Sequence, residues 1–205
     1  YPHDARSPIS EDQMWNGYPQ SESAGYSMAK KMGIVASIAY RKQYGLNSVV
    51  LIPGNLYGEY DNYHREHSHV IPAMIRRYYE ANLEGLPEVR MWGSGRPTRD
   101  FVYAGDVGAL FPWFVKNYDS SDIINISSGT RTSIKELAET IKKHTGYGGK
   151  IEWDSSKPDG QIDKIFDVSR LKALGLSCDT TLDEGLRRTI AWFAENYGKE
   201  GAIRL

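Results

Sequence analysis

The stretch SVVLIPG, residues 48–54, is a continuous apolar run of strand length that stops at Pro53 and Gly54. A strand with one face in water alternates polar and apolar residues, whereas a strand buried on both faces of a parallel sheet has no such alternation. We therefore expect a strand here that needs parallel neighbours. This requirement predicts an α/β chain, in which strands and helices follow one another.

The flanking segments carry this alternation of helix and strand patterns. Residues 26 to about 44 predict a helix that ends at Gly45, with apolar residues near helical spacing at Met28, Met32, Val35, Ile38 and Ala39. A second helix is expected from Val70, with Pro72 tolerated in its first turn. Short strands are expected at 89–92, 101–103 and 123–126, and a helix at 106 to about 118. Two capping boxes predict further helices, Ser133 with Glu136 and Thr181 with Glu184. The first 25 residues read as loop.

Charge and composition exclude several classes of protein. The 205 residues carry 25 basic and 26 acidic side chains, a net charge of −1, so no global field attracts nucleic acid or an anionic membrane. Cys178 is the only cysteine, which excludes an internal disulfide and a multi-cysteine metal site, and we expect no metal. No apolar run approaches the ~20 residues that span a bilayer. A cytoplasmic protein fits these features.

One spacing has a clear chemical use. Tyr26 precedes Lys30 by four residues, which places both on one face of the first predicted helix, and this is the only Tyr-x-x-x-Lys in the chain. An ammonium one helical turn from a phenol stabilises the phenolate and so helps a tyrosine to act as an acid or base. By itself the spacing is also compatible with a surface tyrosine that packs against a lysine stem.

A phosphate-binding unit is missing from the pattern. A dinucleotide-binding domain normally opens with a strand, a glycine-rich turn and a helix whose N-terminus receives the pyrophosphate. The only comparable glycines, Gly93 and Gly95, are followed by Arg96 and Pro97 and open no predicted helix. We therefore expect an N-terminal segment of the protein to be missing from this chain.

Four segments in order resemble the extended short-chain dehydrogenase/reductase family: YSMAK, IPGNLYG, DNYHREHSHVIPAMIRR and MWGSGRPTRDFVYAGDV. The resemblance implies the C-terminal part of a Rossmann-type α/β fold with a smaller α/β substrate-binding domain. Residues 1–65 would end the NADP-binding domain, and residues 66–205 would form mainly the substrate domain, with return segments to the Rossmann core. Within the family, the chain is similar to enzymes that use NADPH to epimerise C3 and C5 and reduce C4 of a GDP-linked 4-keto-6-deoxy sugar.

The resemblance also implies roles for individual residues. Tyr26 matches the acid that protonates the sugar O4, and Lys30 matches the lysine that assists it and binds the nicotinamide ribose. The implied cofactor is NADP(H), which the family holds through a set of residues comprising Tyr26, Lys30, Pro53, Asn55, Leu56 and His69. The pattern departs at Gly54, where a threonine is expected, and this glycine would loosen the turn.

His69 matches the acid for epimerisation. A 4-keto group acidifies the hydrogens at C3 and C5, so a base removes each hydrogen and an acid on the other face returns it. His64 and His67 are rivals, but only His69 directly precedes VIPAMIRR as in the family. Asp61 and Asn62 read as loop residues.

The implied substrate-binding residues are Arg77, Trp92, Arg99 and Lys157. Arg77, Arg99 and Lys157 stand at positions that resemble diphosphate contacts, and Trp92 at one near the nucleotide and sugar. Arginine suits this role because its planar fork bonds two phosphate oxygens at once. The family's catalytic serine and cysteine base come directly before a Tyr-Pro dipeptide, which here is Tyr1–Pro2, so both are expected outside this sequence.

These implications predict an enzyme in the full-length protein, acting on a GDP-sugar as a homodimer, without nucleic acid or membrane as partners. The chain by itself is expected to be inactive. Two alternatives remain open. One is another NAD(P)-dependent nucleotide-sugar enzyme, a 4-epimerase or 4,6-dehydratase, which needs no acid for inversion at C3 and C5. The other is a truncated chain that binds a nucleotide-sugar or a protein without catalysis.

Overall fold

The protein is described by a computed structural model that covers residues 1–203. Its helices are α1 (Ala24–Tyr44), α2 (Val70–Leu83), α3 (Ala104–Asn117), α4 (Ile134–Thr145), α5 (Ser169–Ala173) and α6 (Leu182–Asn196). Two 3₁₀ turns, η1 (Glu11–Trp15) and η2 (Ser21–Ser23), precede α1. The strands are β1 (Leu51–Pro53), β2 (Asn55–Tyr57), β3 (Glu88–Trp92), β4 (Thr98–Arg99), β5 (Phe101–Tyr103), β6 (Ile124–Ile126), β7 (Thr132–Ser133), β8 (Lys150–Asp154) and β9 (Asp163–Lys164).

The strands pair mainly in parallel, as expected for an α/β chain. β1 pairs with β6, β2 with β5 and β3 with β8, each in parallel. β4 lies between β7, which is antiparallel to it, and β9, which is parallel to it. The chain therefore has the α/β fold that the sequence predicts.

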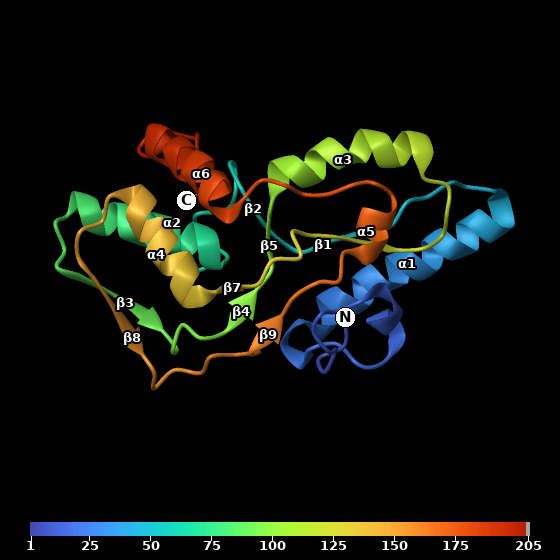
Figure 1. Ribbon diagram of the computed structural model, residues 1–205, viewed down its shortest axis with the longest axis horizontal. Helices are drawn as coiled ribbons and strands as arrows, with labels where there is room; N and C mark the ends of the chain where they lie inside the picture. Colours follow the sequence, from blue (N-terminus) through green and yellow to red (C-terminus); the bar gives the residue numbers. More distant parts are fainter. Residues whose placement is uncertain (204–205) are drawn as a thin grey trace.

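Two main apolar cores hold these elements. The larger lies among α2, α4, α6 and β3, where Met74, Ile75, Leu137, Ile141 and Phe193 are almost completely buried. The second forms between β5, β6, α3 and α5. In Figure 1, α2, α4 and α6 gather at one end of the molecule beside β3 and β8, and α1 lies at the other end with the N-terminus.

Local sequence signals predicted the five longer helices, α1, α2, α3, α4 and α6. α1 ends at Tyr44, and Gly45 follows in the left-handed conformation at φ 67°. α2 begins at Val70 with Pro72 in its first turn. Ser133 and Thr181 cap α4 and α6, because their hydroxyls accept hydrogen bonds from the backbone N–H groups of Glu136 and Glu184. The Glu184 carboxylate binds Arg187 and Arg188 instead of completing its capping box.

Several sequence expectations were wrong. The strand predicted at 48–54 is only three residues long and half-buried, because β6 is its only paired strand in the part of the chain that the structure describes. The stripe of Met28, Met32, Val35 and Ile38 is exposed, because α1 packs through Lys31 and Ile34 on a different face. The short helix α5 and the strands β2, β4, β7, β8 and β9 were not predicted, and the opening loop contains η1, whose Glu11 and Met14 are buried.

Within residues 1–203, no helix has both the length and the apolar character needed to cross a bilayer.

Candidate active site

Tyr26 and Lys30 lie in the first two turns of α1, where both side chains face solvent. Tyr26 is 69% exposed, and the Lys30 ammonium lies 5.5 Å from the centre of its ring. The predicted pair is therefore formed in space. Its phenol is accessible to a ligand, and its cation lies over the aromatic ring.

The turn that joins β1 to β2 is held by backbone and side-chain hydrogen bonds. Gly54 donates its N–H to the carbonyl of Ile126 at 2.9 Å, which extends the β1–β6 ladder. The Asn55 side-chain amide donates to the carbonyl of Asp100 at 2.7 Å, while Leu56 is 42% exposed beside it. Asn55 thus fastens the turn to the strand that begins at Phe101.

Asp100 is a buried carboxylate behind this turn. It accepts hydrogen bonds from the Ser128 hydroxyl at 2.7 Å and from the N–H groups of Gly129 and Phe166. Burial raises the pKa of Asp100, and these donors act in the opposite direction. Three segments from distant parts of the sequence therefore meet at this one side chain.

His69 occupies the N-cap position of α2, yet its side chain makes no capping hydrogen bond. The ring is exposed to solvent. His64 and His67 instead stack on each other, with ring centres 4.7 Å apart. Of the three histidines in this segment, His69 is therefore the one whose ring makes no stacking or capping contact with the described residues.

Asn62 organises the loop before His69, as its assignment to a loop predicted. Its amide nitrogen donates to the carbonyl of His67 at 2.9 Å, and its amide oxygen accepts from the N–H of His64 at 3.1 Å. Asp61 lies close enough to His69 for the two charges to interact, although burial raises the pKa of the Asp61 carboxyl.

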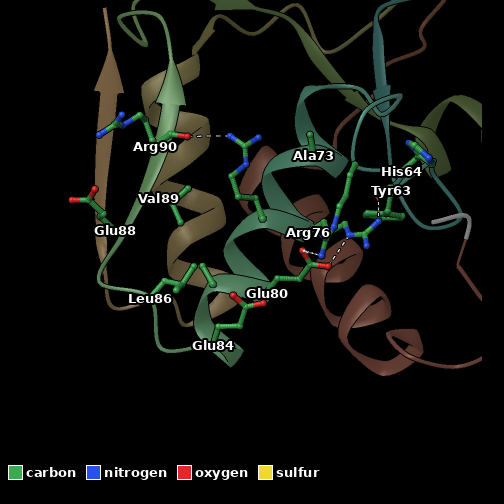
Figure 2. A pocket seen from close by; sticks show the side chains of 13 residues that line it. Tyr63, His64, Ala73, Arg76, Glu80, Glu84, Leu86, Glu88, Val89 and Arg90 are labelled. Atoms are coloured by element: carbon green, nitrogen blue, oxygen red, sulfur yellow. Dashed lines mark hydrogen bonds and ion pairs between the residues drawn. The ribbon is translucent and has the colours of Figure 1, made fainter.

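Arg77 lies in a groove of about 460 Å³ between α2 and β3. Its guanidinium donates to the carbonyl of Arg90 at 3.1 Å. Nearby on α2, Glu80 binds Arg76 at 2.8 Å (Figure 2). Glu80 also binds Arg65 at 3.1 Å. Arg77 lies on α2, whereas Arg99 lies on β4 and Lys157 lies between β8 and β9.

The other three predicted substrate residues gather around the segment between β8 and β9. Lys157 places its ammonium 5.7 Å from the ring centre of Trp92, which is 73% exposed. Arg99, on β4, donates to the carbonyls of Thr98 at 2.8 Å and Gln161 at 2.7 Å. An exposed aromatic ring and two cations therefore border one short segment.

Lys164 joins this cluster and was missed in the sequence. It pairs with Arg99 in the register of β4 and β9, so the two cations are neighbours across the strands. Burial lowers the pKa of Lys164, and Arg99 lowers it further. Burial also lowers the pKa of Arg99. Neither side chain has an ion-pair partner among the residues that the structure describes. The nearby Asp163 carboxylate raises the pKa of Arg99 but forms its ion pair with Arg131. Two adjacent, half-buried cations without an ion pair of their own form a place where an anion is favoured.

The remaining titratable groups do not suit nucleophilic or metal chemistry. Burial raises the pKa of the Cys178 thiol to about 12, and Asp106 and Asp179 act in the same direction, so the sulfur stays a neutral thiol. Across residues 1–203, no cluster of three His, Cys, Asp or Glu side chains could hold a metal ion. The arrangement therefore offers acid–base groups and an anion site.

Comparison with known sequences agrees with these features. Residues 1–127 match the model of a family described as "NAD dependent epimerase/dehydratase family". The chain is 40% identical to the "Probable GDP-L-fucose synthase 1" of Oryza sativa subsp. japonica, over 96% of this chain and 60% of that protein. It is 38% identical to the GDP-L-fucose synthase of Escherichia coli K12, over 96% of this chain and 64% of the relative. The chain thus spans about 60% of the length of these curated relatives.

Solved structures resemble the fold over almost the whole chain. A GDP-L-fucose synthetase from Naegleria fowleri bound to NADP aligns with a TM-score of 0.92 and 29% identity, over 100% of this chain and 65% of that one. A GDP-6-OMe-4-keto-L-xylo-heptose reductase from C. jejuni aligns with a TM-score of 0.88 and 26% identity, over 96% of this chain and 68% of that one.

Proposed function

This chain belongs to the NAD dependent epimerase/dehydratase family, and on that premise we propose that it forms part of an enzyme that epimerises C3 and C5 and reduces C4 of a GDP-4-keto-6-deoxy sugar with NADPH. The likeness to GDP-L-fucose synthases at up to 40% identity supports this substrate class. The observation that carries the proposal is the free ring of His69 at the start of α2. A 4-epimerase or 4,6-dehydratase does not invert C3 and C5, so it needs no acid for those inversions.

Tyr26 is the proposed acid for the reduction. When bound, NADPH supplies the hydride that reduces the C4 ketone. The exposed phenol donates a proton to the developing alkoxide at O4, and the Lys30 ammonium, 5.5 Å from the ring centre, stabilises the phenolate that remains. Lys30 also suits the ribose hydroxyls of the cofactor, because its ammonium has three donors. Pro53, Asn55 and Leu56 form the proposed nicotinamide contact.

His69 is the proposed acid for the inversions at C3 and C5. After a base has removed a hydrogen from one face of the sugar, the imidazolium returns a proton to the other face. An uncapped, exposed ring can reach substrate without breaking a contact within α2.

Arg99 and Lys164 are the proposed diphosphate contacts. A diphosphate brings negative charge next to two adjacent, half-buried cations that form no ion pair among the described residues, so binding offsets their mutual repulsion. Arg77 and Lys157 are further candidates, and the exposed ring of Trp92 offers a surface for the nucleotide or sugar. We also propose the division of the chain into a cofactor-binding part, residues 1–65, and a mainly substrate-binding part, residues 66–205.

The direct test of this function is product analysis. The described residues contain no strand–glycine-rich turn–helix unit that could bind the pyrophosphate. The assay therefore uses a chimera, in which this chain is fused to the part of the E. coli relative that does not align with it. Given GDP-4-keto-6-deoxymannose and NADPH, we expect NADPH oxidation and a product inverted at C3 and C5. Reduction without inversion, or inversion at C4 only, would refute the proposal.

Replacing Arg99 by alanine is expected to weaken GDP-sugar binding by about 1.5–3 kcal/mol, the range for hydrogen bonds to charged groups. The exposed Arg96 lies three residues earlier, outside the pair with Lys164, and Arg96→Ala is the matched control. All the proposed diphosphate residues lie in this chain, so calorimetric titration with GDP-mannose can use the 205-residue protein. Equal affinities for the two variants would remove Arg99 from the site.

Binding of GDP-sugar is also expected to depend on the protonation of Lys164. Its pKa is lowered by burial and by Arg99, so the ammonium is lost at a lower pH than that of an ordinary lysine, whose pKa is about 10.4. As pH rises through this lowered pKa, affinity should fall, whereas Lys164→Arg keeps its charge and should resist the fall. Titrations from neutral to alkaline pH check this, and identical profiles for both proteins would contradict it.

A further inference from the structure

Ser127 carries a buried hydroxyl whose environment is unusual. The residue follows β6 directly and is 2% exposed, and its Oγ has no hydrogen-bond partner among the described residues. Buried hydroxyls are normally paired, because an unpaired one loses its bonds to water. A group left in this state needs a reason for its presence.

The reason lies in the neighbouring turn. A β-carbon built on Gly54 would lie 2.1 Å from the Ser127 Oγ and 2.9 Å from its Cβ, both far inside van der Waals contact. Rotation of the serine could move the oxygen, but its Cβ is fixed by the β6 backbone. The next neighbour, Phe166, would be 3.5 Å away, an ordinary contact. Ser127 is therefore the obstacle to a side chain at residue 54.

Gly54 consequently leaves no gap behind the turn, contrary to the loosening expected from the sequence. The space that a threonine side chain would fill from residue 54 is filled from residue 127 instead. The hydrogen bond from Gly54 N–H to the Ile126 carbonyl, 2.9 Å long, holds the two backbones at this separation. The compartment between β1 and β6 thus admits one small side chain, from either side.

We propose that Ser127 is a positioning residue for the Pro53–Leu56 turn: its side chain fills the compartment behind Gly54 and so sets where the turn meets the nicotinamide. The effect on the nicotinamide rests on the proposed function, whereas the steric contact between residues 54 and 127 concerns this chain alone. The bulk of Ser127 is what acts, because the hydroxyl is buried away from any ligand. The hydroxyl lies near the Asp100 carboxyl and lowers its pKa, but no hydrogen bond of normal geometry joins the two groups.

A thermodynamic cycle on the 205-residue protein tests the steric part. Gly54→Ala is expected to lower the Tm by roughly 2–12 °C, the shift for overpacking in a protein of this size. Adding Ser127→Gly should restore most of the loss, because it removes both clashing atoms. Ser127→Ala keeps the Cβ and removes only the orphan hydroxyl, so its Tm should equal or exceed that of the wild type. If the Tm losses of Gly54→Ala and Ser127→Gly simply added in the double variant, the proposed steric coupling between residues 54 and 127 would be wrong.

NADPH affinity of the chimera, measured by fluorescence titration, tests the positioning role. Ser127→Gly empties the compartment and should weaken NADPH binding severalfold, while Ser127→Ala should leave it unchanged. Gly54→Ser combined with Ser127→Gly fills the compartment from the other side and should restore the affinity. A loss with Ser127→Ala, or no rescue by the exchange, would overturn the proposal. If the chimera binds no NADPH, the proposed function fails and the cofactor part falls with it, whereas the Tm cycle still decides the steric part.

Discussion

The Tyr26→Phe variant is expected to lose reduction of the 4-keto sugar, while hydrogen exchange at C3 and C5 should stay detectable. The phenol serves only the oxygen at C4, so its loss removes acid catalysis from one step. A positioned acid contributes about 10²–10⁴-fold, and the rate of NADPH oxidation by the chimera should fall by that factor. Exchange is followed by proton NMR in deuterated solvent, without NADPH, so the two half-reactions are read separately.

Tyr40 provides the matched control for this variant. It lies on the same helix and is 54% exposed, but it lies outside the first two turns and has no Lys30-like cation over its ring among the described contacts. Tyr40→Phe should therefore leave both half-reactions intact. If Tyr26→Phe lost reduction and exchange to the same extent while still binding GDP-mannose, the phenol would not be confined to C4.

The longer helices could be predicted because their signals are local. Gly45 ends α1, and Ser133 and Thr181 cap α4 and α6 through residues only three positions away. The two-residue strands β4 and β9 carry no such signal. Each is defined by pairing with a strand far away in the sequence, and two residues are too few to show the polar–apolar alternation of a strand. Strand pairing of this kind depends on the folded chain.

The same distinction separates the predicted site residues from the missed ones. Tyr26 and Lys30 are four residues apart, so helical geometry alone brings them together. Lys164 becomes a candidate only when β9 places it beside Arg99. Ser127 likewise gains a role only when β1 and β6 pair, since the clash with residue 54 does not exist in the linear sequence.

The His69→Gln variant is expected to show the opposite behaviour from Tyr26→Phe: it should lose inversion and keep reduction. Reduction should continue, because Tyr26 and NADPH act at C4 without His69. The product should be the unepimerised sugar, since no acid remains to protonate the second face of C3 and C5. Inversion should fall by about 10²–10⁴-fold, the contribution of a positioned acid. Proton coupling constants of the released product distinguish the two configurations directly.

His64 and His67 supply the controls that make this result specific. Their rings stack on each other, and the His64 N–H and the His67 carbonyl are bound by Asn62, so both belong to the loop that supports His69. His64→Gln and His67→Gln should lower inversion only modestly, through the position of the loop, and should keep the product configuration of the wild type. If either variant gave the unepimerised product and His69→Gln did not, that histidine would be the acid. All three rings lie in one segment, and only a ring that reaches the substrate can determine the configuration of the product.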